Sequence, residues 1–499
     1  MGRRGCGCHP SEGSSVRRAQ HHQSNLWHVG CRQRWCLSIT LRRHSNDSIC
    51  YNDSWCYKVN LYKLQMCGIL VAILSKNSQT PFHPDPIKSD ESESESKESK
   101  ESEEPTPVQP EAETKTDDAN TRFLNALQKT KQRGPDYTTT IFSKYTAFGQ
   151  NHLYTGTVPG MKTQWTYVID GYIDTDLGLL LDKHGVDAAH HCNGTFAFVA
   201  YHPVVGLVAS RDIMGISPLY IGVISTLYGH ETWFASELKG LQHCDWYRSF
   251  PIGTVYNGVR YSLLSQPDVK HASLFNLLRS AVEQQLRIEV PWGIILSGGI
   301  HSGIIASLTR FCDRPKGYPV LHTFTIGIQG SPNLAAARSI AKELQSVHHE
   351  VLFTPTEGIQ EITNVIAAIE SYDTTLVQMS IPLYMLARHI RQCGVKVVLS
   401  GLGAEESFTF SNQLYTGCIV NKCMAAHGIA CRVPFMDTSV VHLVDKHISR
   451  TNILTFFKDC VPKGVVHPHN KNKKWIQACE AYGIHRYELI YNTLYPNLI

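Results

Sequence analysis

The chain has 499 residues, 42% of them hydrophobic, and a formal net charge of +4. That length allows two or three domains with their own cores, and so small a charge identifies no class of partner. No apolar run is long enough to cross a membrane, and the first residues lack the apolar segment of a secretory signal, so we expect a cytoplasmic protein without a membrane partner. The 16 cysteines form no CxxC pair, which argues against a zinc ribbon and favours free thiols.

Residues 1–66 are basic and contain several cysteines and histidines. Ten Lys and Arg residues against three acidic ones give this segment a charge of +7 before Met66. One interpretation is a metal-binding or nucleic-acid-binding arm, and another is a disordered extension without a core. We prefer a third, translation starting at Met66, because the segment has no clear periodicity. No nucleic-acid partner is therefore expected.

The sequence from Met66 to Leu70, MCGIL, is typical of the start of a protein with an N-terminal nucleophile. Removal of Met66 would leave Cys67 with both a thiol and a free α-amine, and the amine can act as the base for the thiol. A buried cysteine in a strand is the alternative, since cysteine is often buried. The motifs further along the chain favour the nucleophile.

The chain up to residue 262 has the pattern of an α+β domain rich in strands. An apolar strand is predicted at 67–75 and a helix at 118–132, separated by an acidic insert at 76–117 that includes SDESESESKESKESEE. The insert cannot bury a core and is expected to be disordered. Short strands alternate with turns after residue 137. They include 166–170, 195–201, 207–210 and 233–236, with a short helix at 176–184 among them.

After residue 270, helices alternate with short apolar strands. This alternation predicts an α/β domain with a parallel sheet covered on both faces, and a ligand outside the carboxyl ends of its strands. The first helix begins near Leu274. The predicted strands are 293–296, 321–328, 350–353 and 395–399, and the later helices are 334–345, 358–371 and 380–392.

Two glycine-rich turns follow strands of this predicted sheet. The first runs from Ser297 to Gly303 (SGGIHSG) and the second from Ser400 to Glu406 (SGLGAEE). Glycines expose backbone N–H groups, and a helix N-terminus favours an anion, so the first turn predicts a phosphate site. With acids beside the second turn, the two turns resemble a nucleotide site with room for Mg²⁺. The alternative for the first turn is a plain connection between strand and helix. The alternative for Glu405 and Glu406 is a solvated first helical turn, where acids interact favourably with the helix dipole.

The ordered motifs MCGIL, RGPD, GTFAFVAY, SRDIMGISPLY, FASELKGL, LSGG, GSPN, VHHE, LSGLG and CRVPFMD resemble glutamine-hydrolysing asparagine synthetase of the bacterial B type. The resemblance covers residues 66 to about 465. It implies an N-terminal-nucleophile αββα glutaminase domain at 67–262 and an ATP pyrophosphatase-type, adenine nucleotide α-hydrolase-like domain at 263–499. It also implies glutamine, aspartate and ATP as substrates, Mg²⁺ as cofactor, β-aspartyl-AMP as intermediate, and a homodimer as one expectation.

For the glutaminase site, the resemblance makes Cys67 the nucleophile and Gly171 a backbone donor. Arg133 matches the arginine that binds the glutamine α-carboxylate, and Asp176 the aspartate that holds its α-amine. Asp170 and Tyr172 complete the glutamine-binding positions, but both depart from the family. Asp170 replaces an asparagine that donates to the oxyanion, which an ionised carboxylate cannot do, and Tyr172 replaces an acid.

For the synthetase site, the resemblance places ATP and pyrophosphate contacts in the two turns and the strands before them. The positions are Leu296, Ser297, Gly298, Gly299, Ser302, Ile326, Ser400 and Gly401, with Glu405 as a metal ligand. His301 stands where the family has an Asp linked to Mg²⁺, and Leu402 where it has a Glu. Imidazole suits Mg²⁺ poorly, so we carry two hypotheses: a working synthetase, and a pseudoenzyme that keeps the fold and nucleotide binding.

Overall fold

The computed structural model describes residues 68–74, 119–143, 145–155, 163–226, 229–265, 273–313, 317–404, 415–447, 457, 473–483 and 485–495. The extension 1–66, Cys67, the insert 76–117 and Glu405 lie outside these residues, so the expectations about them stay predictions. Among the described helices, none is long and apolar enough to cross a membrane. The cysteines at described positions are free thiols, as the sequence predicted.

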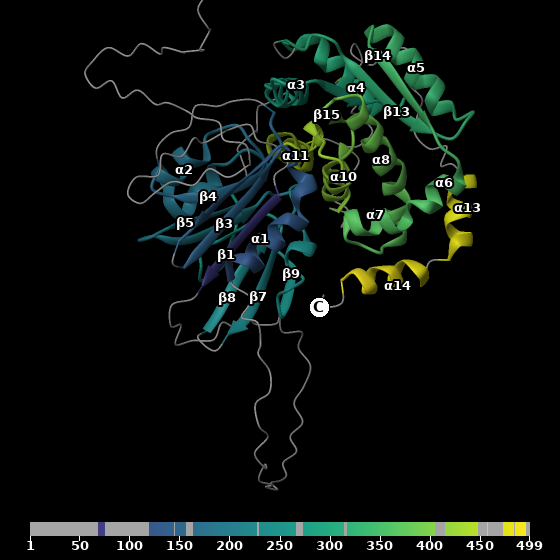
Figure 1. Ribbon diagram of the computed structural model, residues 1–499. Helices are drawn as coiled ribbons and strands as arrows, with labels where there is room; N and C mark the ends of the chain where they lie inside the picture. The colour runs from purple at the N-terminus through teal and green to yellow at the C-terminus, as the bar shows by residue number, and fades with distance from the viewer. Residues whose placement is uncertain are drawn as a thin grey trace, which may run out of the picture. The chain divides into compact units, whose positions relative to one another are not determined.

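Two antiparallel sheets form the first half of the described chain (Figure 1). One has the strand order β2-β3-β1-β8-β7-β9 and the other β11-β10-β6-β5-β4. The strands are β1 (Gly68–Leu74), β2 (Tyr137–Phe142), β3 (Thr146–His152), β4 (Thr166–Ile173), β5 (Gly194–His202), β6 (Gly206–Arg211), β7 (Tyr220–Thr226), β8 (Gly229–Ala235), β9 (Trp246–Ser249), β10 (Thr254–Tyr256) and β11 (Tyr261–Leu263). The helices are α1 (Ala119–Lys129), η1 (Lys131–Arg133), α2 (Leu177–His184), η2 (Gly185–His191) and η3 (Leu238–Gly240).

The alternation of side chains along these strands produces four layers. In β1, Ile69 packs between the two sheets, whereas Leu70 faces the other way, toward Phe123 of α1. On the second sheet, Phe198 faces outward and packs with Leu181 of α2. Because successive side chains of a strand point to opposite faces, each sheet fills one core with its partner and another with a helix. The predicted αββα arrangement is confirmed.

The second half is built on a parallel sheet with the order β14-β13-β12-β15-β16. Its strands are β12 (Trp292–Ile295), β13 (His322–Gly327), β14 (Val347–Leu352), β15 (Val397–Ser400) and β16 (Ala430–Arg432). The helices are α3 (Leu274–Gln285), α4 (Ile300–Leu308), η4 (Thr309–Phe311), α5 (Pro332–Leu344), α6 (Pro355–Gln360), α7 (Ile362–Ile369), α8 (Thr374–Gln392), α10 (Tyr415–Ala425), η5 (Pro434–Met436), α11 (Thr438–His447), α13 (Lys473–Tyr482) and α14 (His485–Leu494). Helices α4, α5 and α8 contact its strands, and the α/β prediction is confirmed.

Three predicted boundaries in this half were wrong, and two have an evident local cause. The single helix expected at 358–371 is two helices, and the first starts early because Thr354 and Glu357 form a capping box. Helix α8 begins at Thr374 rather than 380, because the Asp373 carboxylate caps it by accepting a bond from the Leu376 N–H (2.9 Å). Strand β14 begins at Val347 rather than 350, and its pairing with β13 already starts there, with Val347 opposite His322.

Buried His152 predicts that acid destabilises the fold. Burial, with a smaller contribution from Lys131, lowers the pKa of His152 to about 3. In the unfolded chain His152 binds a proton near pH 6.5, whereas in the folded chain it does so only near pH 3. Its contribution to the free energy of unfolding is therefore fully present above pH 6.5 and is lost as the pH falls toward 3. At pH 5 the loss should be about 2 kcal/mol.

Urea unfolding of the wild-type chain and of His152→Gln, measured from pH 7 to pH 5, checks this expectation. The midpoint of the wild-type chain should fall more steeply than that of the variant. Equal pH dependence in the two chains would contradict the assignment to His152.

Candidate functional site

The two glycine-rich turns lie side by side at the carboxyl ends of β12 and β15. These strands are parallel neighbours, with Ile295 paired to Ser400. The chain leaves β12 to one side, through β13 and β14, and adds β15 and β16 on the other. A strand order that reverses in this way places a ligand-binding crevice outside the two central strands. The predicted turns stand on both sides of that reversal.

Gly401 brings the second turn into contact with the first turn of α4. A Cβ at this position would lie 2.5 Å from the Ser302 nitrogen and 2.5 Å from the His301 carbonyl carbon. Gly298 has a φ of +79°, and a Cβ there would lie 2.6 Å from the Asn333 carbonyl oxygen. Both positions therefore require glycine, one for close backbone contact and one also for its left-handed conformation.

The N-terminus of α4 offers hydrogen-bond donors of the kind that bind phosphate. Its N-cap residue is Gly299, which has no side chain to cap the helix. The hydroxyls of Ser297 and Ser302 lie 3.0 Å apart, and the Ser302 hydroxyl also donates to the Gly299 carbonyl (3.0 Å). Together the helix dipole and the two hydroxyls favour an anion at this end of the helix.

The other predicted nucleotide contacts surround these turns. Leu296 is buried and donates its N–H to the Phe324 carbonyl (2.7 Å), so it continues the sheet after β12. Ile326 lies in β13 and is half-buried. Ser400 ends β15, and its hydroxyl accepts a bond from the Leu402 N–H (3.1 Å). These residues can offer apolar surface and backbone groups to a nucleotide.

The described part of this site does not fit Mg²⁺. The turn residues 296–303 and 400–404 contain no carboxylate. His301, at the position of the expected metal-linked Asp, instead packs edge-on against Phe435, with ring centroids 5.7 Å apart. Mg²⁺ requires oxygen ligands, which an imidazole does not supply. Glu405, the remaining predicted ligand, lies outside the described residues.

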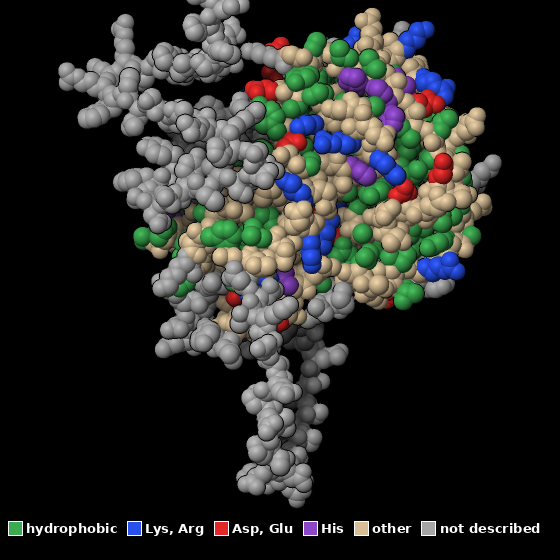
Figure 2. All heavy atoms as spheres, viewed as in Figure 1, with side chains coloured by type: hydrophobic (Ala, Val, Ile, Leu, Met, Phe, Trp, Pro, Cys, Tyr) green, Lys and Arg blue, Asp and Glu red, His purple; other side chains and the backbone are tan. Residues whose placement is uncertain are grey.

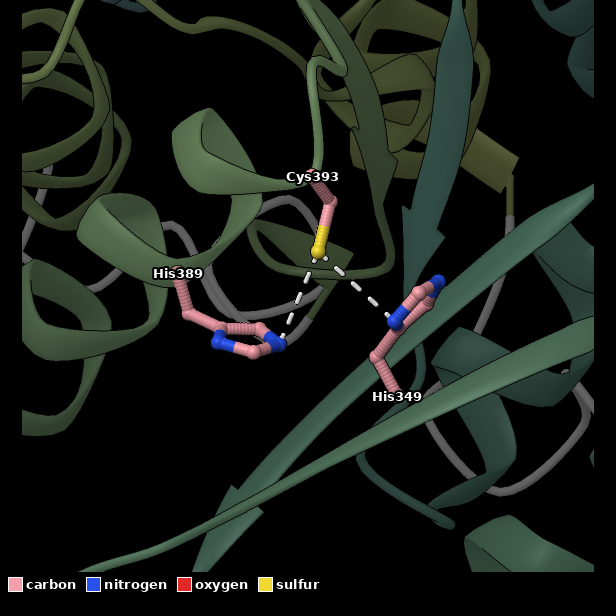
Figure 3. Close-up of side chains that lie close together, drawn as sticks. All are labelled: His349, His389 and Cys393. Atoms are coloured by element: carbon pink, nitrogen blue, oxygen red, sulfur yellow. Dashed lines mark hydrogen bonds between the residues drawn. The ribbon is translucent and has the colours of Figure 1, made fainter.

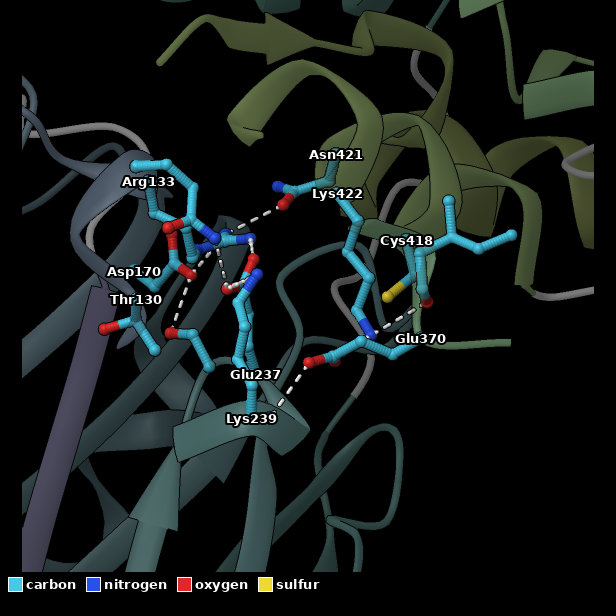
Figure 4. Close-up of polar contacts among 12 residues, drawn as sticks. Thr130, Arg133, Asp170, Glu237, Lys239, Glu370, Cys418, Asn421 and Lys422 are labelled. Carbon is cyan, nitrogen blue, oxygen red and sulfur yellow. Dashed lines mark hydrogen bonds and ion pairs between the residues drawn. The ribbon is translucent and has the colours of Figure 1, made fainter. Parts of the chain in front are cut away.

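In the first half, Arg133 and Asp170 form a fully buried ion pair (Figure 4). The guanidinium donates to an Asp170 oxygen (2.7 Å), to Glu237 (3.3 Å) and to the Asn421 side-chain oxygen (2.9 Å). Burial alone would lower the pKa of Arg133, but Asp170 and Glu237 raise it above its ordinary value. The arginine predicted to bind a substrate carboxylate is thus bound by carboxylates of the protein itself.

Ser236 connects this ion pair to the beginning of β1. Its hydroxyl donates to the same Asp170 oxygen (3.0 Å) and accepts the Ile69 N–H (3.1 Å). The Ser236 N–H in turn donates to the Ile69 carbonyl (3.1 Å). The strand that follows Cys67 is therefore held against Asp170 and, through it, against Arg133.

The remaining predicted glutamine-site residues lie in β4 and just after it. Gly171 has a φ of +104°, and a Cβ there would lie 2.1 Å from the Thr195 carbonyl oxygen, so no other residue fits. Tyr172 is buried, and the Arg432 guanidinium carbon lies over the Tyr172 ring, 5.7 Å from the ring centroid. Burial raises the pKa of the Tyr172 phenol to about 12. Asp176 caps α2, where its carboxylate accepts the Leu179 N–H (3.1 Å).

The sequence reasoning missed a second buried group of charges beside the first. The Lys422 ammonium donates to Glu370 (2.6 Å), to the Tyr220 hydroxyl (2.6 Å) and to the Ile369 carbonyl (3.1 Å), which uses all three of its protons. Burial alone would lower the pKa of Lys422, but Glu370 raises it above its ordinary value. A lysine within the mostly apolar helix α10 was the available signal.

The two groups together balance three positive charges with three negative ones. Lys239 joins them, since its ammonium lies 2.8 Å from Glu237 and its N–H donates to Glu370 (3.1 Å). Asn421 and Lys422 come from α10 of the parallel-sheet half, whereas Arg133 and Tyr220 come from the first half. This network therefore binds the two halves of the described chain to one another.

Comparison with known proteins yields matches in both halves. The family model "Asparagine synthase" matches residues 273–417, and "Glutamine amidotransferase domain" matches residues 161–243. Among solved structures, NMN synthetase from Francisella tularensis aligns over 45% of this chain and 90% of that one, at 14% identity and with a TM-score of 0.26. A TM-score of 0.26 is too low to support an inference.

Curated relatives similar to this chain carry the name glutamine-hydrolysing asparagine synthetase, and three of them illustrate the range. The protein of Sandersonia aurantiaca is 32% identical over 53% of this chain, that of Zea mays 34% over 52%, and that of Saccharomyces cerevisiae 30% over 64%. The matches cover 58%, 51% and 72% of those proteins, so the chain spans little more than half the length of the first two.

Proposed function

Because the chain belongs to the glutamine-hydrolysing asparagine synthetase family, we propose that its parallel-sheet half binds ATP and uses it to amidate aspartate. One observation carries the proposal. The two glycine-rich turns meet at the reversal of strand order, where Gly401 touches the first turn of α4. That arrangement brings backbone donors and two serine hydroxyls to one point, as phosphate binding requires.

In this proposal the triphosphate lies on the N-terminus of α4. Ser297, Gly298, Gly299 and Ser302 bind phosphate oxygens, and Leu296, Ile326, Ser400 and Gly401 contact the rest of the nucleotide. The aspartate side-chain carboxylate attacks the α-phosphorus, pyrophosphate leaves, and ammonia then displaces AMP from β-aspartyl-AMP to give asparagine. No step is assigned to Mg²⁺, because the described residues of the two turns supply it no carboxylate.

The first half has the proposed role of supplying ammonia from glutamine. Cys67 is the nucleophile, Gly171 donates to the oxyanion, and Arg133 and Asp176 bind the substrate. The buried Arg133–Asp170 pair (2.7 Å) opposes this role, because the guanidinium is already neutralised and the Asp170 charge repels an oxyanion. We therefore propose that free ammonia is the more efficient nitrogen source for this chain.

A second candidate function is nucleotide binding without turnover. It is favoured by the same ion pair and by His301, which packs on Phe435 where the family places an acid. The two candidates share the nucleotide site and differ in the chemistry after binding. Measurement of binding and of turnover on the same protein therefore separates them.

The test pairs ATP affinity, measured by calorimetry, with pyrophosphate release in the presence of aspartate and ammonium. Ser302→Ala should weaken ATP binding about tenfold or more, because it removes a hydroxyl bonded to a charged phosphate. Ser307→Ala is the matched control, since Ser307 is equally buried in the last turn of α4. Aspartate-dependent pyrophosphate release supports the synthetase, and binding without release supports the second candidate. Absence of ATP binding would refute both.

A further inference from the structure

Three metal-ligand side chains converge at the edge of the parallel sheet, among residues for which the proposed reaction has no use. His349 lies in the edge strand β14, His389 in the last turn of α8, and Cys393 at the C-cap of the same helix. Their ligand atoms lie within 4.8 Å of one another, and the side chains point to a common centre (Figure 3). All three are half-buried, so solvent can supply an ion.

The two sulfur–nitrogen distances within this cluster are those of a tetrahedral metal site. The Cys393 sulfur lies 3.7 Å from Nδ1 of His349 and 3.6 Å from Nε2 of His389. A tetrahedral Zn²⁺ with a sulfur at about 2.3 Å and a nitrogen at about 2.1 Å holds those two atoms about 3.6 Å apart. His389 and Cys393 are four residues apart at the end of a helix, a spacing that places them on one face.

A fourth side chain orients the ring of His349. Nδ1 of His322, the first residue of β13, lies 3.0 Å from Nε2 of His349, and the two rings meet edge to edge, with centroids 5.3 Å apart and planes inclined by 23°. A proton on Nε2 of His349, donated to His322, leaves Nδ1 unprotonated and directed at the cluster. Metal-binding histidines are commonly fixed in this way by a partner on their other nitrogen.

The neighbouring histidine belongs to a different environment. His348 points to the other side of β14, where its Nδ1 lies 3.0 Å from the Thr323 hydroxyl. Histidine side chains gather on the face of the molecule over β13 and β14 (Figure 2). The strand alternation thus selects His349, and not His348, for the cluster.

We propose that Nδ1 of His349, Nε2 of His389 and the Cys393 thiolate bind a zinc ion, with the fourth position taken by solvent. The thiol proton passes to solvent when the ion binds. The site is separate from the nucleotide turns, because it lies at the amino-terminal half of β13 and β14 and those turns follow the carboxyl ends of β12 and β15. The ion joins the end of α8 to the edge of the sheet.

The competing explanation is a pair of thiol–imidazole hydrogen bonds without a metal. Co²⁺, which takes the same ligands as Zn²⁺, distinguishes the two. A thiolate bound to tetrahedral Co²⁺ gives a sulfur-to-metal charge-transfer band and intense visible bands, whereas a hydrogen-bonded thiol gives neither. With Co²⁺ bound, the full-length chain should show both features, and added Zn²⁺ should displace the Co²⁺ and abolish them.

Variants assign the ion to this cluster, since cysteines elsewhere in the full chain can also bind metal. Cys393→Ser and His389→Gln should each lower the zinc content, measured by elemental analysis, by one equivalent per chain. Cys192→Ser is the matched control, because Cys192 is also a half-buried free thiol at the end of a helical segment and should leave the content unchanged.

His322→Phe tests the orienting role, since it keeps an aromatic ring against His349 but removes the acceptor nitrogen. It should keep the charge-transfer band and weaken the affinity about 10–100-fold. A wild-type chain without a thiolate–Co²⁺ band would overturn the proposal. So would a zinc content that is the same in Cys393→Ser and Cys192→Ser.

Discussion

Arg133→Met should lower the free energy of unfolding by about 3–5 kcal/mol, because it leaves buried carboxylates without their partner. The Arg133 side chain is 0% exposed, as is Asp170, and Glu237 is 1% exposed. Lys239 still neutralises Glu237 at 2.8 Å, so the larger penalty falls on Asp170. Guanidinium unfolding followed by circular dichroism measures the change.

Arg338→Met is the matched control for this prediction. The Arg338 guanidinium also binds a carboxylate, that of Glu350 at 2.6 Å, but the Arg338 side chain is 59% exposed. Solvent screens such a pair, so the unfolding midpoint should hardly change. Equal effects of the two substitutions would mean that the Arg133 ion pairs do not hold the fold together.

The sequence was sufficient for the parts of the fold that depend on local pattern. The apolar strands around Ile294 and Val398 were placed correctly, because strand signals are local. The first predicted glycine-rich turn ends earlier than expected, since helix α4 already begins at Ile300. The early start of α8 was also available in principle. Asp373 followed by Thr-Thr-Leu is a helix start, but the apolar periodicity that guided the prediction begins later in the helix.

The ion-pair network could not be predicted in the same way. Arg133 finds partners that are 37, 104 and 288 residues away in the sequence. No local pattern connects Arg133 with Asp170, Glu237 and Asn421, and the predicted partner of Arg133 was a substrate carboxylate rather than a carboxylate of the protein. The same holds for the cluster of His349, His389 and Cys393, since His349 in β14 is 44 residues away from Cys393 in the sequence. Tertiary contacts, rather than propensity, decide which polar groups share a site.

The buried pair also predicts how glutamine hydrolysis could be improved. Asp170→Asn should raise the rate by about 10²–10³-fold, because it replaces a repelling charge with an amide that can donate to the oxyanion. An asparagine oxygen can still accept the bond from Arg133 while its N–H₂ group donates. The substitution also leaves more of the guanidinium charge for a substrate carboxylate. Glutamate release from glutamine, measured on protein that begins at Cys67, gives the rate.

Glu237→Gln separates the two reasons for this expected gain. This substitution removes the Glu237 carboxylate, which lies 3.3 Å from the Arg133 guanidinium, but it places no amide at residue 170. If the missing oxyanion donor limits the reaction, Asp170→Asn should accelerate hydrolysis and Glu237→Gln should not. Equal acceleration by both would mean that the occupied Arg133 is the obstacle. If Asp170→Asn is no faster than Cys67→Ala in the same assay, this half of the protein does not hydrolyse glutamine, and the nitrogen for any amidation must come from free ammonia.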